Sequence, residues 1–384
     1  MSRARILADY VSSGDELADK APLASPEFTG TPTGITATHV GLGNVTNESK
    51  ATMLATSTLT GVTTAASLVL TPSSAPAITE GAIYYDSTSD KVNVWNGTAW
   101  EQISNLIGFE AKGTGGHITN YSIGSTNYVS HTFTTSGVFT PTSSFNVDYL
   151  VVAAAGGGSG MPSGSSYHGG SGGGGAGGFR SATGFSVSAQ SYTITVGSGG
   201  ASNGVGGTAS NGSNSVFSSI TSTGGGHGAR GNQGVAAGNG GSGGGASREA
   251  TTAGSGTSGQ GNAGGGYTSS GGDAGGGGGS GAVGSAGGNG GAGTANSYRT
   301  GSAVTYAGGG GGGSGGNLAQ VDGTGGTGGS GGGGAGGNAN FGTGGAGSPN
   351  TGSGGGGGSA GDNATGSSTG SSGGSGIVII RYTI

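Results

Sequence analysis

The sequence lacks cysteine and carries little charge, and both absences exclude classes of protein. Without cysteine the chain can form neither a disulfide nor a thiolate metal site. Charged residues make up 7% of it, with no basic field that would attract nucleic acid or an anionic membrane. The histidines are too scattered for a metal-ligand motif: His39, His117, His131, His168 and His227. We therefore expect no metal, no cofactor and no nucleic-acid partner.

Long apolar runs are missing as well. No 18-residue apolar segment exists, so we expect no membrane insertion. The start, "MSRARILADYVSSGDELADK", has arginines but no apolar core of a signal peptide. We expect a protein that is made in a cytoplasm and stays there or leaves without a Sec-type signal.

Glycine is what the chain has in excess, and it is unevenly placed. Of the 104 glycines, fourteen precede Gly156 and ninety lie between Gly156 and Gly376. Charge divides in the same way, with a net of −6 over 1–155 and +1 over the remainder. The chain therefore consists of two unlike halves.

The N-terminal half offers little material for a core. A short helix is expected within 1–20, and the Thr-, Pro- and Gly-rich stretch 21–79 reads as extended chain that needs oligomerisation for stability. Residues 80–104 are more definite, because Ile83, Tyr85, Val92 and Val94 alternate around the turn residues "STSD". This pattern predicts a β-hairpin. Trp95 and Trp100 are expected in its core or in an oligomer contact rather than in sugar stacking.

The C-terminal half contains several strand-like runs. Strands are expected near 128–135, 145–155, 179–187, 191–197 and 214–223, and in the terminal "IVIIRYTI". In the second of these, Phe145, Val147, Tyr149 and Val151 should face one side, with Leu150 and Val152 on the other. The terminal strand needs a partner, and "YLVVAAA" is the natural one. We expect the two ends of the glycine block to meet in one β-sheet.

Between those ends, the glycine runs allow two interpretations. Composition alone favours a flexible linker, because fixing glycine is entropically expensive and side-chain burial cannot offset it. Against a linker stand the closing strand and the regularly spaced aromatic and arginine inserts. Glycine can also adopt the polyproline II helix, whose outward-pointing N–H and C=O groups can bond neighbouring helices. We expect a packed array of polyglycine II helices.

Several stretches resemble a known family. "FNVDYLVVAAAGGGS", "GGAGGFRSATGFSVSAQSYTITVGSGG" and the final "GSGIVIIRY" resemble the glycine-rich domain of phage tail fibres and bacterial surface proteins, over roughly 128–384. The polyglycine II sandwich of adhesins at some T-even-like phage fibre tips is similar in composition. "ASPEFTGTPT" and "HVGLGNVTNESKATM" resemble fibre shaft sequence, and "YYDSTSDKVNVWNGTAW" a phage structural module. The resemblance implies a homotrimeric fibre that is attached to the virion by its N-terminus and meets the host with its C-terminal end.

These observations predict a mostly β and irregular fold. A fibrous trimeric N-terminal β region with a short helix should precede a small β-hairpin module and a C-terminal β-sheet domain that carries the polyglycine II array. The expected divisions are a virion-attachment segment (1–30), an extended shaft or linker (31–79), the hairpin module (80–105), a strand-rich part (106–223), the array with exposed loops (224–376) and the closing strand (377–384).

Catalytic patterns are weak, so we expect no enzyme. Matches to G-x-G-x-x-G arise by chance in the glycine runs and introduce no βαβ unit. Only four acids lie beyond residue 155, too few for a convincing glycosidase pair. No G-x-S-x-G elbow appears in a strand–turn–helix context.

The inserts of the block carry the candidate binding residues. Tyrosine and arginine dominate recognition surfaces, and loops on a rigid scaffold commonly bind ligands. The candidates for receptor contact are Tyr167, His168, His227, Arg230, Arg248, Tyr267, Tyr298, Arg299 and Tyr306. Solvated turns are the plainer interpretation of the same residues.

The expected function is therefore that of a phage tail-fibre adhesin in the virion, assembled in the cytoplasm of a bacterial host. Its expected partners are two further copies of itself, a tail or adaptor protein, and a protein or glycan receptor on the host. The alternatives are a head or collar fibre without receptor specificity, a bacterial surface adhesin and a polysaccharide depolymerase.

Overall fold

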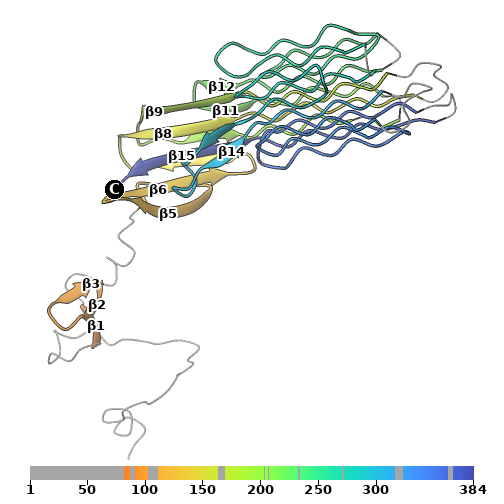
Figure 1. Cartoon of the computed structure of the whole chain (residues 1–384). Coiled ribbons are helices and arrows are strands. Elements are labelled where there is room, and N and C mark those ends of the chain that lie inside the picture. Colours follow the sequence, from red (N-terminus) through yellow and green to blue (C-terminus); the bar gives the residue numbers. More distant parts are fainter. Residues whose placement is uncertain are drawn as a thin grey trace, which may run out of the picture. The chain divides into compact units, whose positions relative to one another are not determined.

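The computed structural model describes residues 82–86, 91–102, 111–162, 169–202, 204–205, 207–231, 234–269, 272–315, 323–361 and 366–384. The helix expected within 1–20 and the extended stretch expected over 21–79 lie outside these residues. Among them, β-strands occur and α-helices do not, which confirms the mostly β and irregular fold (Figure 1).

The hairpin module is a three-stranded antiparallel sheet. It contains β1 (Ile83–Asp86), β2 (Lys91–Trp95) and β3 (Trp100–Gln102), in that order. Trp95 is paired with Trp100, their ring centroids 5.6 Å apart, and Tyr84 meets the edge of Trp100 at 4.7 Å. The side chain of Asn96 closes the turn by accepting two main-chain N–H groups. The half-buried tryptophans thus pack against each other and against Tyr84.

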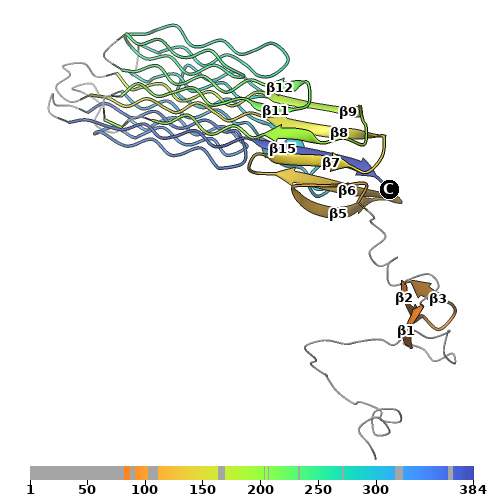
Figure 2. The ribbon, with the colours of Figure 1, turned by 180° about the vertical axis from the view of Figure 1, so that it is seen from behind.

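Two five-stranded antiparallel sheets form the base of the C-terminal domain (Figures 1 and 2). One has the order β5-β6-β15-β8-β9 and the other β12-β11-β10-β7-β4. The strands are β4 (Gly113–Thr114), β5 (His117–Ile123), β6 (Thr126–Phe133), β7 (Gly137–Pro141), β8 (Phe145–Val152), β9 (Phe179–Val187), β10 (Tyr192–Thr195), β11 (Ser215–Phe217), β12 (Ile220–Ser222) and β15 (Ile377–Thr383). Buried side chains from both sheets, including Phe139, Val151, Phe217 and Ile380, form the core between them. We call this part the sandwich.

A hairpin of β13 (Thr294–Asn296) and β14 (Val304–Tyr306) covers the other face of the first sheet. Tyr306 packs there with Leu150 and Val152 of β8. The alternation expected along β8 is confirmed, since Val147 and Val151 enter the sandwich core while Leu150 and Val152 face the hairpin. The sheet is therefore covered on both faces.

The closing strand β15 lies in the middle of that sheet. It pairs with β8 on one side, with Ile377 opposite Val152, and with β6 on the other. The two ends of the glycine block therefore meet in one β-sheet, as the sequence predicted. Two strand predictions need correction. The strand expected over 145–155 ends at Val152, and the stretch 214–223 is not one strand but the hairpin β11–β12, whose turn holds Ser218 at a φ of 53°.

The glycine block forms an ordered array, and its hydrogen bonds show the geometry. Along 170–178, successive N–H groups donate in rotation to three neighbouring segments. The acceptors in chain order are the carbonyls of Gly272, Gly358, Ala229, Gly275, Gly355, Gly226, Gly278, Gly352 and Thr223. Each neighbour therefore returns every third residue, which is the period of the polyproline II helix.

The carbonyl groups of the same segment bond in the same rotation, but to three other segments. Over 171–176 they accept in turn from the N–H groups of Gly313, Ser159, Gly245, Gly310, Gly156 and Ser242. One central helix is thus surrounded by six others from the same chain, and the expected packed polyglycine II array is confirmed. In Figures 1 and 2 these segments run side by side away from the sandwich.

The tight packing explains why glycine is needed here. A Cβ atom built on Gly174 would lie 2.1 Å from the carbonyl oxygen of Gly156, and one on Gly310 would lie 2.1 Å from that of Gly355. The main-chain hydrogen bonds replace a hydrophobic core as the link between segments. The flexible-linker interpretation, which composition alone favoured, is therefore wrong for the described part of the block.

Candidate functional site

The nine candidate receptor residues separate into different places. Tyr167 and His168 lie outside the described residues. Arg230, Arg248 and Tyr267 come together at the end of the array that is remote from the sandwich. His227 lies on its own part of the array, and Tyr298, Arg299 and Tyr306 belong to the β13–β14 hairpin and its turn.

The remote end of the array gathers side chains from three segments. The carbonyl of Arg230 accepts the hydroxyl of Ser247 at 3.0 Å, which joins the segment of Arg230 to that of Arg248. Gly169, which begins the central helix, lies against the side chain of Arg248. Arg248, Glu249 and Asp273 all act electrostatically on the hydroxyl of Tyr267. We call Arg230, Arg248, Glu249, Tyr267 and Asp273 the tip cluster.

The side chains of the tip cluster combine exposure with the capacity to form hydrogen bonds and ion pairs. Arg248 and Glu249 are exposed, and Tyr267 is half-buried. Burial raises the pKa of Tyr267, so its hydroxyl stays a neutral donor and acceptor. Among the described residues, the buried Nε–H of Arg230 has no hydrogen-bond acceptor.

His227 lies away from the tip cluster, along the segment that runs from the sandwich to it. Its main-chain N–H donates to Asn211 Oδ1 at 2.8 Å, and its ring Nδ1 lies 3.1 Å from the carbonyl of Gly228. The side chain is half-buried. The structure therefore gives His227 local hydrogen bonds and no place among the other candidates.

The three hairpin candidates lie at the opposite end, over the first sheet. Tyr306, a candidate for receptor contact from an insert, is 1% exposed and packs with Leu150 and Ile379, so it is a core residue and not an exposed one. It is held there because β14 covers the apolar outer face of the sheet. Tyr298 is half-buried against the same cluster, and Arg299 is exposed in the turn.

Sequence reasoning missed the residues that hold this hairpin in place. The guanidinium of Arg381 lies 3.9 Å from the ring centre of Tyr298 and 4.6 Å from that of Tyr128. Tyr121 donates its hydroxyl to the carbonyl of Tyr298 at 2.9 Å. Such cation–π contacts are strongest where water is excluded. The "RY" of the closing strand did not indicate these contacts of Arg381, because the partner tyrosines lie more than 80 residues away in sequence.

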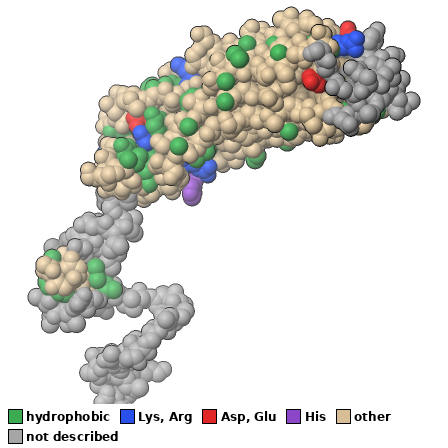
Figure 3. Space-filling view, viewed as in Figure 1, with side chains coloured by type: hydrophobic (Ala, Val, Ile, Leu, Met, Phe, Trp, Pro, Cys, Tyr) green, Lys and Arg blue, Asp and Glu red, His purple; other side chains and the backbone are tan. Residues whose placement is uncertain are grey.

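The charge distribution separates the two ends. Figure 3 shows charged side chains gathered toward both ends of the C-terminal domain, with a long, largely uncharged flank between them. Among the described residues, no group of three potential metal ligands occurs. The described part of the chain also contains no helix that could span a lipid bilayer.

Comparison with known families gives one result. A model of the glycine-rich domain matches residues 132–383. The chain belongs to this glycine-rich domain family. The match begins within β6 and ends with the last residue of β15, so the glycine-rich domain comprises most of the sandwich, the array and the tip cluster. The comparison with curated proteins gives no significant match.

Proposed function

We propose that the chain is a non-enzymatic adhesin of a phage tail fibre, in which the glycine-rich domain carries a receptor-binding tip. The observation that supports this most is the arrangement of the domain. The strands at both of its ends, β6 and β15, pair with each other in the sandwich, while the tip cluster lies at the far end of the array. A domain tied at one end and carrying arginine and tyrosine at the other is suited to reach a surface.

The array supplies rigidity to such a tip. Ten residues of polyproline II helix span about 31 Å. Because each central segment is bonded to six neighbours, the tip residues are carried on main chain that is fixed before binding. Preorganisation of this kind lowers the entropic cost of association.

The remaining parts of the proposal rest on the resemblance described above. The N-terminal half would attach to the virion through a tail or adaptor protein and would trimerise. The receptor would be a protein or glycan of the host cell surface. In the proposed fibre the protein carries no cofactor and cleaves nothing.

Cell binding by purified full-length protein tests the proposal. Fluorescently labelled protein is incubated with a panel of bacterial strains that differ in surface glycans and outer-membrane proteins, and bound label is measured by flow cytometry. Arg248→Ala and Tyr267→Ala should each reduce binding to the responsive strain at least tenfold. Arg299→Ala, an exposed arginine at the other end, is the matched control and should bind normally.

Two results would count against the adhesin. If no strain binds the protein, or if tip variants bind as well as the control, a head or collar fibre without receptor specificity is favoured. Loss of surface polysaccharide during incubation would instead indicate a depolymerase.

A further inference from the structure

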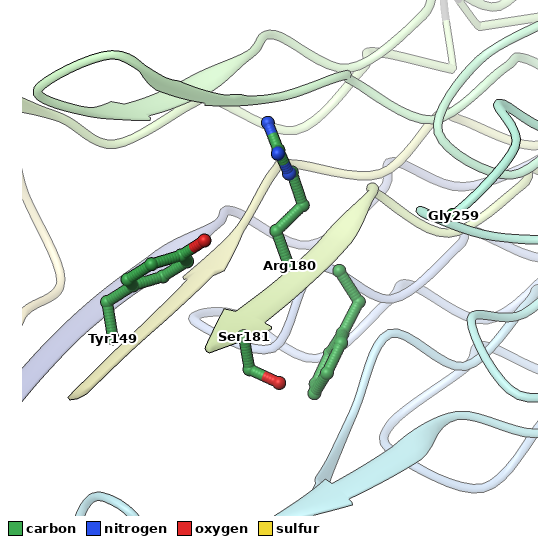
Figure 4. A pocket seen from close by; sticks show the side chains of 5 residues that line it. Tyr149, Arg180, Ser181 and Gly259 are labelled. Atoms are coloured by element: carbon green, nitrogen blue, oxygen red, sulfur yellow. The ribbon is translucent and has the colours of Figure 1, made fainter. Parts of the chain in front are cut away.

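A groove runs along the open edge of β9, on the flank of the glycine-rich domain and away from the tip cluster. β9 is the last strand of its sheet, so its outer side has no partner among the strands that the structure describes. One cavity of about 350 Å³ is lined by Tyr149, Phe179, Arg180, Ser181 and Gly259 (Figure 4). An adjoining cavity of about 250 Å³ shares Phe179 and Gly259 and is completed by Gln260, Gly261, Asn262 and Ser280.

The main chain of β9 offers hydrogen bonds to this groove. Phe179 donates its N–H outward, to the carbonyl of Gln260 at 2.9 Å, and not to β8. Since N–H and C=O groups of an antiparallel strand alternate between its two sides, the N–H and C=O of Ser181 also point outward. At its start, therefore, the edge already binds a peptide carbonyl, and two residues later it presents a donor and an acceptor that bond to no main-chain group of the described residues.

The cavities lie where the side chains of an added strand would go. Phe179 and Ser181 pair with Val152 and Leu150, and so share the sheet face of the β13–β14 hairpin. Arg180 pairs with Val151 and stands on the other face, with Tyr149. In Figure 4 the side chains of Arg180 and Ser181 leave β9 in opposite directions. Successive side chains of an added strand alternate between the same two faces.

The positive charge of Arg180 indicates which class of ligand the groove would bind. With the described residues, Arg180 makes one hydrogen bond, from Nη1 to the carbonyl of Thr221 at 3.3 Å, and no salt bridge. The hydroxyl of Tyr149 points to the same side of the strand as Arg180 (Figure 4). Both groups suit a carboxylate. A second copy pairing through the same edge about a two-fold axis would bring two Arg180 side chains together, which disfavours self-association.

We propose that the edge of β9 binds an extended acidic peptide of another protein by strand addition, with acidic side chains on the Arg180 face and small apolar ones beside Phe179. Main-chain bonds to Ser181 would give affinity, and the two cavities would give sequence preference. A charged side chain on an edge strand can also serve only to prevent edge-to-edge aggregation. That role of Arg180 would not require cavities on both faces of the strand. The proposal is independent of receptor binding at the tip.

Fluorescence anisotropy with the full-length protein tests the proposal. The probe is a fluorescein-labelled hexapeptide of alternating valine and glutamate, which as a strand places all carboxylates on one face. Saturable binding is expected, with at least tenfold weaker binding of the valine–lysine peptide. Arg180→Gln should weaken binding at least tenfold, whereas Arg299→Gln, an exposed arginine elsewhere, should not change it.

Two further measurements separate strand addition from binding of a charge alone. The same peptide N-methylated at alternate residues on its bonding edge keeps its carboxylates but loses the donors, and its affinity should fall at least tenfold. An unfolding midpoint of Arg180→Gln equal to that of the parent establishes that the fold is intact. The proposal is overturned if the valine–glutamate peptide does not saturate, if the N-methylated peptide binds equally well, or if an oligosaccharide of glucuronic acid displaces the peptide with the same dependence on Arg180.

Discussion

Arg381 and Asp148, separated by 233 positions in sequence, form an ion pair across the neighbouring strands β15 and β8, with Nε 3.0 Å from Oδ2. The side chains are 11% and 22% exposed. The same guanidinium stacks on Tyr298 and so links the sheet to the hairpin above it. Arg381, which lies in β15 after the glycine block, therefore contacts both β8, which precedes the block, and the β13–β14 hairpin from the middle of it.

Replacing Asp148 by asparagine keeps the shape of the side chain and removes its charge. Because the pair is partly buried, we expect a loss of about 2 kcal/mol in the free energy of unfolding, between the values for surface and buried pairs. Chemical denaturation monitored by tyrosine fluorescence measures this. Glu249→Gln makes the same chemical change in the exposed tip cluster and should alter stability little. Equal stability of both variants would mean that the ion pair contributes nothing.

The buried His131 predicts a pH dependence of stability. Its Nδ1–H donates to the carbonyl of Gly115 at 2.7 Å, and its Nε2 accepts the hydroxyl of Tyr382 at 2.9 Å. Burial lowers the pKa of His131 below its ordinary value, and burial raises the pKa of Tyr382 to about 12, so both rings stay neutral. The unfolded chain, in contrast, takes up a proton on this histidine below about pH 6.5.

The sign of the effect follows from these states. His131 imposes no penalty above about pH 6.5, and stability falls as the pH drops from there toward the lowered pKa of the folded state, by at most about 1.4 kcal/mol per pH unit. Unfolding measured between pH 5 and 8 should show this loss, and His131→Gln should reduce the slope between pH 5 and 6.5. The exposed His117 is the control, since His117→Gln should leave the slope unchanged.

The array predicts a sharp difference between two glycines. Gly174→Ala would place a methyl group 2.1 Å from the carbonyl oxygen of Gly156 inside the central helix, whereas a Cβ on Gly266 meets nothing within 4 Å. We expect Gly174→Ala to cost about 3 kcal/mol or more, because neighbouring main chain must move. Gly266→Ala should be neutral or slightly stabilising, since alanine restricts the unfolded chain. Thermal unfolding of the two variants distinguishes these outcomes, and equal midpoints would contradict the packed array.

Limited trypsin digestion followed by mass spectrometry tests the order of the same region. Arg230 and Arg248 are the cleavage sites of the tip cluster, and the main chain around both is hydrogen-bonded. We expect slow cleavage after both arginines in the native protein and fast cleavage in a heat-unfolded sample. Cleavage at equal rates in the two samples would mean that the glycine block is a flexible linker.

The sequence predicted the parts of the fold that depend on local pattern or on the lack of side chains. The alternating pattern along β8 and the apolar character of β15 were sufficient to predict that these two strands lie side by side in one sheet. The array followed from the need to satisfy main-chain groups in segments with no side chains to bury. Both predictions rest on requirements that hold for any chain of this composition, and they do not depend on which segments of the glycine block contact each other.

What could not be predicted depends on which segments meet. Tyr306 looks like other tyrosines of the inserts, and only the position of β14 over Leu150 makes it a core residue. The turn at Ser218 has no glycine or asparagine at its positive-φ position, so the β11–β12 hairpin gave no signal. Of the tip cluster, Arg230, Arg248 and Tyr267 were predicted as separate candidates, whereas Glu249 and Asp273 were not predicted at all. The register of the array brings these residues together, and it could not be derived from the sequence.

The direction of the array's hydrogen bonds has a mechanical consequence. The segments run from sandwich to tip, while their bonds cross from one segment to the next. A pull on the tip against the base therefore acts along the segments and strains many bonds at once in shear, instead of opening them one after another. An array built almost without side chains can in this way resist tension through its main chain alone.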